Sequence, residues 1–406
     1  MKLIDRIITD TRIPEALSVL LNGEPRRPLF FDIETTGLQP AGCYIYLIGC
    51  LTDTPEGLRF RQWFAENADE EPALLTAFCE SIEADNVLVH YNGTTFDIPF
   101  LNARIRYRNL PLTMPRKEDS IDLYRYLTPC KKLFGLDNRR QPTLEKLAGY
   151  DRTDPYDGGT LISFYTEYVA RCRFDHERAA ELLDSLLLHN SDDILGLSQL
   201  ASLLPYCMIA DLPFGRLTQS EEDGIFTITA DLPYALPKPF RKVLPLPEIP
   251  EACRVDTSAN VDMYAGCGTD AAAASLSSPF PEPDSDGYFA DLLLSDNRLR
   301  LQVPVYKMAP YFYFPNYKDY YYLPVEDKAI HKSLAAVVEK QYRKPATRET
   351  ARQQKNGSFL PQITEYIGPV FRLHYGDELC FFEKRALDDA ALGEYLKNWF
   401  AFLTGN

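Results

Sequence analysis

The sequence predicts an α/β protein with a mixed sheet in its first half and a second, β-rich α+β domain in its second half. Three strand-like runs come first, and helical and strand-like segments then alternate, which is the order of a mixed sheet covered by helices. Beyond residues 203–206 prolines become dense and long helical periodicity disappears. A chain of 406 residues is also long enough for two domains.

The expected elements of the first domain follow from residue type and spacing. Residues 1–27 are expected to be a helical or irregular lead-in to a domain at 28–204. Runs of β-branched and aromatic residues predict strands at 28–34, 44–51, 58–64, 86–91 and 120–124. Apolar residues at helical spacing predict helices at 71–84, from about 96, at 143–149, at 159–172 and at 175–204.

The second domain, 205–406, is predicted mainly from strand-like runs at 224–230, 299–305 and 369–375. One helix is expected at about 328–343, because its apolar residues fall on one face. The stretch at about 264–286 is small, polar and proline-rich, which is typical of a flexible loop.

Composition excludes several classes of function. The net charge of −15 gives no whole-molecule attraction to nucleic acid, so a polyanion would need a local basic patch or metal ions. The nine cysteines form no CxxC pair and no Cys/His cluster, which argues against a zinc ribbon, an iron–sulfur cluster or a secreted disulfide scaffold. The N-terminus does not resemble a signal peptide, and no apolar run approaches the ~20 residues of a membrane span. We therefore expect a cytoplasmic protein without a membrane partner.

Asp32 and Glu34 stand at the end of the first predicted strand. Residues i and i+2 of a strand point to the same face, so these two carboxylates project together. Paired carboxylates near a core repel each other and are costly to bury, and a divalent cation relieves that cost. An exposed acidic strand end is the alternative interpretation.

Further acidic side chains follow at two places. Asp97 falls in the first turn of a helix after the strand at 86–91, where it is either a helix-start carboxylate or a neighbour of Asp32 and Glu34. In the long helix, His189 and Asp193 are i and i+4 and share a face. Asp192 lies about 100° from Asp193 around the helix axis and should point elsewhere. A polar helix patch is the alternative here.

Taken in order, these motifs resemble the DEDD superfamily of 3′–5′ exonucleases, which have a ribonuclease H-like fold. The resemblance is carried by Phe31-Asp-Ile-Glu-Thr-Thr-Gly37, His90-Tyr-Asn-Gly-Thr-Thr-Phe-Asp97 and His189-x-x-x-Asp193, and it covers about residues 25–204. The pattern is most similar to bacterial ribonuclease H-like proteins of YprB type. One DEDD branch has Tyr four residues before the last Asp and the other has His five before it, whereas His189 stands four residues before Asp193.

The resemblance implies a site and a reaction. Asp32, Glu34, Asp97 and Asp193 are expected to hold two Mg²⁺ or Mn²⁺ ions, with Asp192 as the fallback fourth ligand. His189, with a pKa near its ordinary ~6.5, is expected to take the proton from the attacking water. Substrate contacts are expected from Thr35, Thr36, Gly37, Leu38 and Asn92, and Asn92 could instead brace Asp97. The implied activity is two-metal-ion hydrolysis of a single-stranded DNA or RNA end.

Two rival functions and one unassigned region remain. The same fold could be a catalytically silent nucleic-acid-binding protein, or the carboxylates could belong to a metal-independent hydrolase. In the second domain, an aromatic-rich run at 306–322 precedes a basic run at 328–355. This pair of runs either binds single-stranded nucleic acid or is a Tyr-rich core strand beside a solvated helix face.

Overall fold

A computed structural model describes residues 1–21, 23–255 and 287–404, and the loop expected at 264–286 falls outside this described part. The chain divides into two compact units. Unit 1 comprises Met1–Met208 with Leu236–Lys238, and unit 2 comprises Ile209–Ala235 with Pro239–Asn406. The sequence placed the boundary at 204/205. No helix in the described part of the chain has the length and apolar character needed to cross a membrane.

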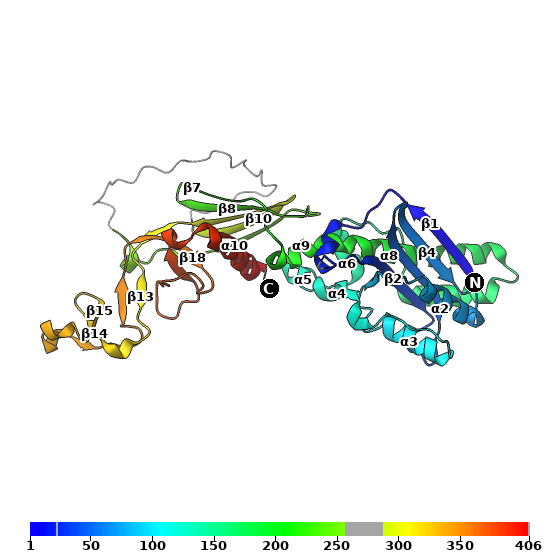
Figure 1. Ribbon diagram of the computed structural model, residues 1–406, viewed down its shortest axis with the longest axis horizontal. Coiled ribbons are helices and arrows are strands. Elements are labelled where there is room, and N and C mark those ends of the chain that lie inside the picture. The colour runs from blue at the N-terminus through cyan, green and yellow to red at the C-terminus, as the bar shows by residue number, and fades with distance from the viewer. Residues whose placement is uncertain (22, 256–286, 405–406) are drawn as a thin grey trace. The chain divides into compact units, whose positions relative to one another are not determined.

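Unit 1 is built on a six-stranded mixed sheet of order β1-β4-β3-β2-β5-β6 (Figure 1). Its strands are β1 (Lys2–Ile8), β2 (Arg27–Thr35), β3 (Ile45–Thr54), β4 (Gly57–Phe64), β5 (Asn86–His90) and β6 (Ile121–Asp122). The strands β1 to β4 pair antiparallel, whereas β5 runs parallel to β2 and β6 runs parallel to β5. The predicted mixed sheet is confirmed, and the carboxyl ends of β2 and β5 meet at one edge of it.

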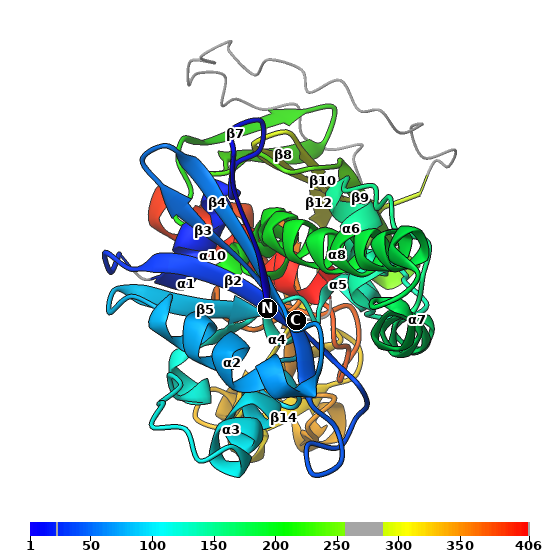
Figure 2. The ribbon, with the colours of Figure 1, turned by 90° about the vertical axis from the view of Figure 1, so that its right-hand side faces the viewer.

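Helices cover both faces of this sheet (Figure 2). They are α1 (Ser18–Leu21), α2 (Glu71–Glu80), α3 (Asp97–Tyr107), α4 (Leu123–Tyr126), α5 (Cys130–Leu133), α6 (Gln141–Ala148), α7 (Gly158–Arg171), α8 (His176–Gln199) and α9 (Leu204–Cys207). Phe31 and Ile33 of β2 pack into one core with α2 and α3. Tyr46 and Phe64 pack into a second core with α7 and α8. The alternate residues of β2 therefore point away from the first core, and Asp32 and Glu34 are among them.

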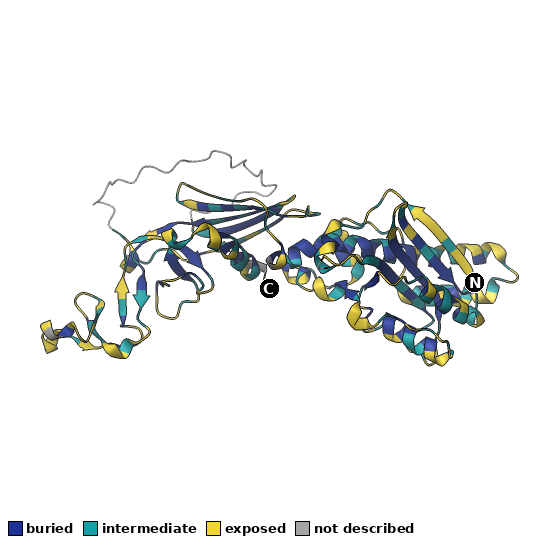
Figure 3. Cartoon of the chain, viewed as in Figure 1, coloured by how far each residue is buried: buried dark blue, intermediate teal, exposed yellow. Residues whose placement is uncertain are grey.

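The N-terminal segment corrects the expectation of a helical or irregular lead-in. Lys2–Ile8 form β1, which pairs with β4 along its whole length. Most of its side chains are exposed (Figure 3), because β1 is an edge strand with charged residues at Lys2, Asp5 and Arg6. Charges of this kind protect an exposed sheet edge from pairing with another chain. Because of these charges, the alternation of apolar and polar residues does not predict this strand.

Unit 2 is β-rich, as predicted. A five-stranded antiparallel sheet has the order β7-β8-β11-β10-β9, and three smaller sheets have the orders β12-β18-β19, β13-β17 and β15-β14-β16. The strands are β7 (Leu217–Glu222), β8 (Ile225–Asp231), β9 (Phe240–Pro245), β10 (Phe289–Ser295), β11 (Arg298–Pro304), β12 (Tyr306–Met308), β13 (Tyr311–Tyr313), β14 (Tyr320–Leu323), β15 (Lys328–His331), β16 (Lys344–Pro345), β17 (Arg352–Gln354), β18 (Gly357–Gln362) and β19 (Cys380–Glu383). One long helix, α10 (Asp389–Thr404), was not predicted.

Two predictions in unit 2 were wrong. The expected helix at 328–343 is strand β15 followed by two single 3₁₀ turns. Its apolar stripe has no surface to cover, since Leu334 is 63% exposed and Val337 is 89% exposed. The expected strand at 369–375 contributes only isolated bridges at Phe371 and Arg372. Helical spacing of apolar residues alone does not make a helix where tertiary packing is missing.

Candidate functional site

The two carboxylates of β2 face helix α8. Asp32 pairs in register with Gly49 of β3, and the side chain of Asn190 from α8 donates to Asp32 Oδ2 at 3.4 Å. Gly49 is needed for this close approach, because a Cβ there would lie 2.1 Å from Asn190 Oδ1. Gln62 Nε2 also donates to that Oδ1 atom, at 3.0 Å. The sheet thus fixes the face of α8 that meets Asp32.

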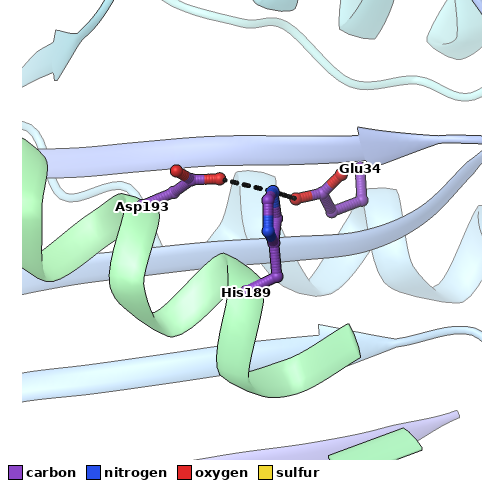
Figure 4. Close-up of side chains that lie close together, drawn as sticks. All are labelled: Glu34, His189 and Asp193. Carbon is purple, nitrogen blue, oxygen red and sulfur yellow. Dashed lines mark ion pairs between the residues drawn. The ribbon is translucent and has the colours of Figure 1, made fainter. Parts of the chain in front are cut away.

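His189 and Asp193 lie one turn apart on α8 and point toward Glu34 (Figure 4). His189 Nε2 is 3.1 Å from Asp193 Oδ2 and 3.8 Å from Glu34 Oε1. The ligand atoms of these three residues lie within 4.8 Å of one another, so they form a group that could hold a metal ion. The i, i+4 spacing in the sequence predicts this shared face.

Asp97 is buried at the first turn of α3, where β5 ends beside β2. Burial raises the pKa of its carboxyl group, and the backbone of Ile33, between Asp32 and Glu34, acts in the opposite direction. Gly93 allows this arrangement, because a Cβ there would lie 3.0 Å from Asp97 Oδ2. Asp97 therefore reaches the same strand end as the β2 carboxylates, although it is not among the three residues of the tightest group.

Asp122, at the end of β6, holds the turn that leads to Asp97. Its two carboxylate oxygens accept from the backbone N–H of Asn92 at 2.8 Å and from Thr94 Oγ1 at 2.6 Å. Asn92 adopts a left-handed conformation with φ +62°. Its side-chain oxygen accepts from Thr95 Oγ1 at 2.9 Å, so this group supports the turn itself.

Asp192 points away from Asp193 and organises the segment before α7. One of its oxygens accepts from Tyr150 Oη at 2.8 Å, and the other accepts from the backbone N–H groups of Thr153 at 2.8 Å and Asp154 at 2.7 Å. The same segment returns Asp154 to α8, where the buried Asp154 carboxylate accepts from His189 Nδ1. Asp192 acts on the site through this segment, and its position does not support the fallback role as a ligand.

A positive charge also enters the site. Arg152 forms an ion pair with Asp193, and its Nε lies 3.3 Å from Glu145 Oε2. Glu145 is buried against Gly196 of α8, where a Cβ would lie 2.0 Å from Glu145 Oε1. Gln141 Nε2 bridges Glu145 Oε1 and the Asp193 backbone oxygen, each at 2.8 Å. Arg152 thereby partly neutralises the acidic cluster.

Burial and crowding strongly perturb the carboxylates of the cluster. Burial, together with the charges of Asp193, Asp97 and Glu34, holds the pKa of Asp32 well above its ordinary value. Burial likewise raises the pKa of Glu34 to about 8 and that of Asp97 to about 7. Three carboxyl groups with raised pKa values at one strand end form a site that would gain from a cation.

The pKa of His189 is raised and that of Asp193 is lowered, so both shifts favour the charged form. Burial disfavours the charged form of His189, but its hydrogen bond to Asp193 and the charges of Asp193 and Glu34 outweigh burial and raise its pKa to about 9. Burial raises the pKa of Asp193, but the hydrogen bond from His189 and the charges of His189 and Arg152 lower it overall. The expectation of an ordinary pKa for His189 is therefore wrong for the protein alone, because two carboxylates face the ring.

The expected substrate residues other than Asn92 lie at the end of β2 and the start of its connection to β3. Thr35 Oγ1 donates to the Gly37 backbone oxygen at 2.9 Å, and Thr36 N–H donates to the Tyr44 backbone oxygen at 3.0 Å. A Cβ on Gly37 would lie 2.6 Å from Cys43 Sγ, so this turn is tight. Leu38 is 80% exposed next to it.

Sequence reasoning missed four contributors to the site: Asp122, Arg152, Asp154 and Asn190. Asn190 lies between His189 and Asp193, which the sequence singles out. Its place next to His189 in α8 could have predicted that it faces the sheet. Asp154 and Arg152 lie in an irregular segment, where no periodicity predicts direction. The segment is held by hydrogen bonds from the backbone N–H groups of Thr153 and Asp154 to Asp192, which only the folded chain shows.

Comparison with known proteins identifies the class of the first unit. Residues 29–204 match the family model RNase_H_2, described as RNase_H superfamily. This segment of the chain therefore matches the RNase H superfamily. No curated protein matches the chain.

Solved structures are similar over part of the chain. The family B DNA polymerase from the hyperthermophilic archaeon Pyrobaculum calidifontis is 14% identical, with 51% of this chain and 34% of the polymerase covered and a TM-score of 0.32. The zinc-bound E. coli ExoI–ssDNA complex is 18% identical, with 39% and 43% covered and a TM-score of 0.26. E. coli Exonuclease I with a dT13 oligonucleotide is 19% identical, with 40% and 44% covered and a TM-score of 0.26. The chain spans less than half the length of each.

Proposed function

We propose that unit 1 is a metal-dependent nuclease of the DEDD type that hydrolyses phosphodiester bonds, acting as a 3′–5′ exonuclease on single-stranded DNA or RNA. The observation that carries this proposal is the convergence of Glu34, His189 and Asp193 within 4.8 Å of one another. Asp32 adjoins them on the same strand, and the convergence occurs in an RNase H superfamily domain. Structural neighbours that are complexes with single-stranded DNA agree with the substrate class.

The donor set fits a pair of hard divalent ions. Asp32, Glu34, Asp97 and Asp193 offer carboxylate oxygens, which Mg²⁺ and Mn²⁺ prefer, and burial has already raised the pKa of three of them. When bound, two such ions would lower the pKa of an attacking water and stabilise the leaving oxygen. To bind an ion, Asp193 would have to loosen its ion pair with Arg152.

His189 is assigned the role of general base, acting through Nε2. Asp154 accepts from Nδ1, which keeps the proton of the neutral ring on that nitrogen and leaves Nε2 directed at Asp193 and Glu34. These two carboxylates raise the pKa of His189, and they are also proposed ligands. Neutralising their charge by ligation removes that rise and returns the ring toward its ordinary ~6.5, where it can accept a proton at neutral pH.

The substrate end is assigned to the turn after β2. The turn at Thr35, Thr36, Gly37 and Leu38 begins one residue after Glu34, so a nucleotide bound there would present its phosphate to the carboxylates. Exposed Leu38 offers an apolar contact for a base, and exposed Asn92 offers a polar one.

Two alternatives have an observation in their favour. The pairing of Arg152 with Asp193 supplies a counter-charge without metal, as a catalytically silent nucleic-acid-binding domain would require. The raised pKa of Glu34 beside the lowered pKa of Asp193 is the pattern of an acid–base pair in a metal-independent hydrolase.

One experiment separates the three. Purified protein is incubated with end-labelled single-stranded DNA and RNA in parallel, with Mg²⁺, with Mn²⁺ and with EDTA. The proposal predicts that the labelled oligonucleotide is shortened only when a divalent ion is present. It also predicts that the variants Asp32→Ala and Asp193→Ala lose this activity. Activity that survives EDTA would favour the metal-independent hydrolase. Binding without cleavage under every condition would favour the silent domain.

A further inference from the structure

Residues 311–355 of unit 2 differ in charge from the rest of the protein. They contain nine Lys and Arg residues against five Asp and Glu, in a chain whose net charge is −15. They form the sheets β13-β17 and β15-β14-β16 with the turns between them. This is therefore a local positive region on an acidic protein, which is the setting in which a polyanion can be held.

The aromatic residues of this region are not a buried core. Tyr311 is buried, whereas Tyr317, Tyr320, Tyr321 and Tyr322 are only partly buried. Phe314 stacks on Tyr320 with ring centroids 4.3 Å apart. The interpretation as a Tyr-rich core strand beside a helix holds only for the start of the aromatic run, where Tyr306 and Tyr311 are buried in a core cluster. It fails for residues 317–322, whose rings are only partly buried, and the helix expected at 328–343 is absent.

Cations lie over two of the partly buried rings. Arg343 and Lys332 lie 4.7 Å and 5.8 Å from the centroid of Tyr321, and Arg348 lies 5.9 Å from that of Tyr317. The Lys332 N–H donates to the Asp319 backbone oxygen at 2.8 Å, which ties the turn that carries Tyr317 to β15. Rings and cations thus alternate on one small sheet and its adjoining turn.

The cations over Tyr317 and Tyr321 differ in their ion pairs from the other cations of unit 2. Arg352, by contrast, lies over Tyr311 and is neutralised by Asp327, 2.7 Å away, which makes that group a structural junction. Lys355 of the same region also pairs with a carboxylate, as do Lys384 and Arg372 elsewhere in unit 2. For Lys332, Arg343 and Arg348 the described residues supply no carboxylate at ion-pair distance.

We propose that Tyr317, Tyr321, Lys332, Arg343 and Arg348, together called the Tyr321 surface, bind single-stranded nucleic acid. The unneutralised cations contact phosphates, and the rings with their guanidinium neighbours stack on unpaired bases without reading sequence. The choice of nucleic acid among polyanions rests on the proposed function of unit 1. The surface itself lies in unit 2 and uses none of the residues of the acidic site.

The test measures binding of the full chain to fluorescent oligo-dT by anisotropy in EDTA, so that no cleavage occurs. The triple variant Lys332→Gln, Arg343→Gln, Arg348→Gln is expected to bind about tenfold more weakly or worse, and its salt slope is expected to fall by roughly 2. The double variant Lys332→Gln, Arg348→Gln retains Arg343, which donates to the Ala335 backbone oxygen, and covers the case in which the triple variant is unstable.

A matched control removes three exposed cations elsewhere in unit 2, with Arg216→Gln, Lys242→Gln and Lys307→Gln, and is expected to change binding little. Tyr317→Leu with Tyr321→Leu should weaken binding roughly tenfold, whereas the two Phe substitutions should retain it. Equal losses in the control, or no effect of the Leu substitutions, would overturn the proposal. Competition by polyglutamate as effective as by oligo-dT would also overturn it, in favour of an acidic protein partner.

Failure of this inference is distinguishable from failure of the proposed function. Binding that depends on the Tyr321 surface, together with no cleavage under any metal condition, would contradict only the nuclease assignment. Cleavage that depends on Asp193, together with binding unchanged in the variants, would contradict only the Tyr321 surface.

Discussion

His189 and Asp154 form a buried pair in which ring nitrogen Nδ1 donates to the carboxylate. Asp154 is itself held by Asp192, which lies three residues after His189 on the same helix. The pair sets the direction of Nε2, which faces Glu34 and Asp193. The orientation of the proposed base is therefore determined by a residue far from it in sequence.

Replacing Asp154 with Asn should lower kcat by about 10²-fold or more, because the ring can then place its proton on the wrong nitrogen. KM and metal affinity should change little, because Asp154 touches neither substrate nor the proposed ligands directly. Steady-state kinetics with Mg²⁺ measure this split. Asp151→Asn, an exposed carboxylate of the same segment, is the control. A rise in KM that accompanies the fall in kcat would point to a disrupted fold instead.

Replacing His189 with Phe should cut turnover by roughly 10²–10⁴-fold, the usual contribution of a general base. Metal binding should stay nearly intact if His189 is a base and not a ligand. Calorimetric titration with Mn²⁺ distinguishes the two roles. Affinity that drops together with turnover would make the imidazole a metal ligand beside Glu34 and Asp193.

Arg152→Gln should destabilise the metal-free protein most, because it leaves buried Glu145 without its counter-charge and Asp193 with His189 alone. Breaking such a buried pair costs about 3–5 kcal/mol. Mg²⁺ should recover part of that loss, since it supplies charge to Asp193. Thermal unfolding with EDTA and with Mg²⁺ measures the difference, and exposed Arg173→Gln serves as the control. Identical losses under both conditions would show that Arg152 does not compensate Asp193.

The stability of the metal-free protein should fall as pH rises from about 5 to 9. The folded-state pKa values of Glu34 and Asp97 are raised to about 8 and about 7. The two groups therefore ionise at lower pH in the unfolded chain, and the free energy of unfolding decreases as the pH rises above about 4. The pKa of His189 is raised to about 9 in the folded protein. Its charged form therefore stabilises the fold at low pH, and this contribution is lost as the pH rises from its unfolded-state pKa of ~6.5 to about 9. Melting temperatures across this range should decline in EDTA and decline less with Mg²⁺. A flat or rising profile in EDTA would contradict the clustering of these groups.

Gly49→Ala should both destabilise the fold and reduce activity. The new Cβ would lie 2.1 Å from Asn190 Oδ1 and 3.1 Å from Ile194 Cγ1, so α8 must move away from β3. Overpacking of this kind costs roughly 1–3 kcal/mol. Denaturant unfolding measures the change against Gly42→Ala, where a Cβ meets no atom within 4 Å. Equal stability of the two variants would mean that α8 can yield at no cost.

Much of unit 1 could be predicted from the sequence, because its strands and helices have the periodicity of elements with one buried face. The end of β2 and the face shared by His189 and Asp193 follow directly from periods of 2 and 3.6. Edge strand β1 could not be predicted this way, since solvent on its outer side permits charges where alternation is expected. Asp154 and Arg152 could not be placed because irregular backbone is set by tertiary hydrogen bonds. The helix predicted at 328–343 was wrong for a different reason. Its apolar residues have helical spacing, but no other element in the described part of the chain covers them as one face.

The central claim is that the β2 carboxylates and Asp193 form one catalytic metal site. Its most direct test compares Asp193→Asn with Asp184→Asn, an exposed carboxylate on the same helix, in Mg²⁺-dependent shortening of a 5′-labelled single-stranded oligonucleotide. We predict a ladder of shortened products for the unmodified protein and for Asp184→Asn, and none for Asp193→Asn. An undiminished ladder from Asp193→Asn would contradict the assignment.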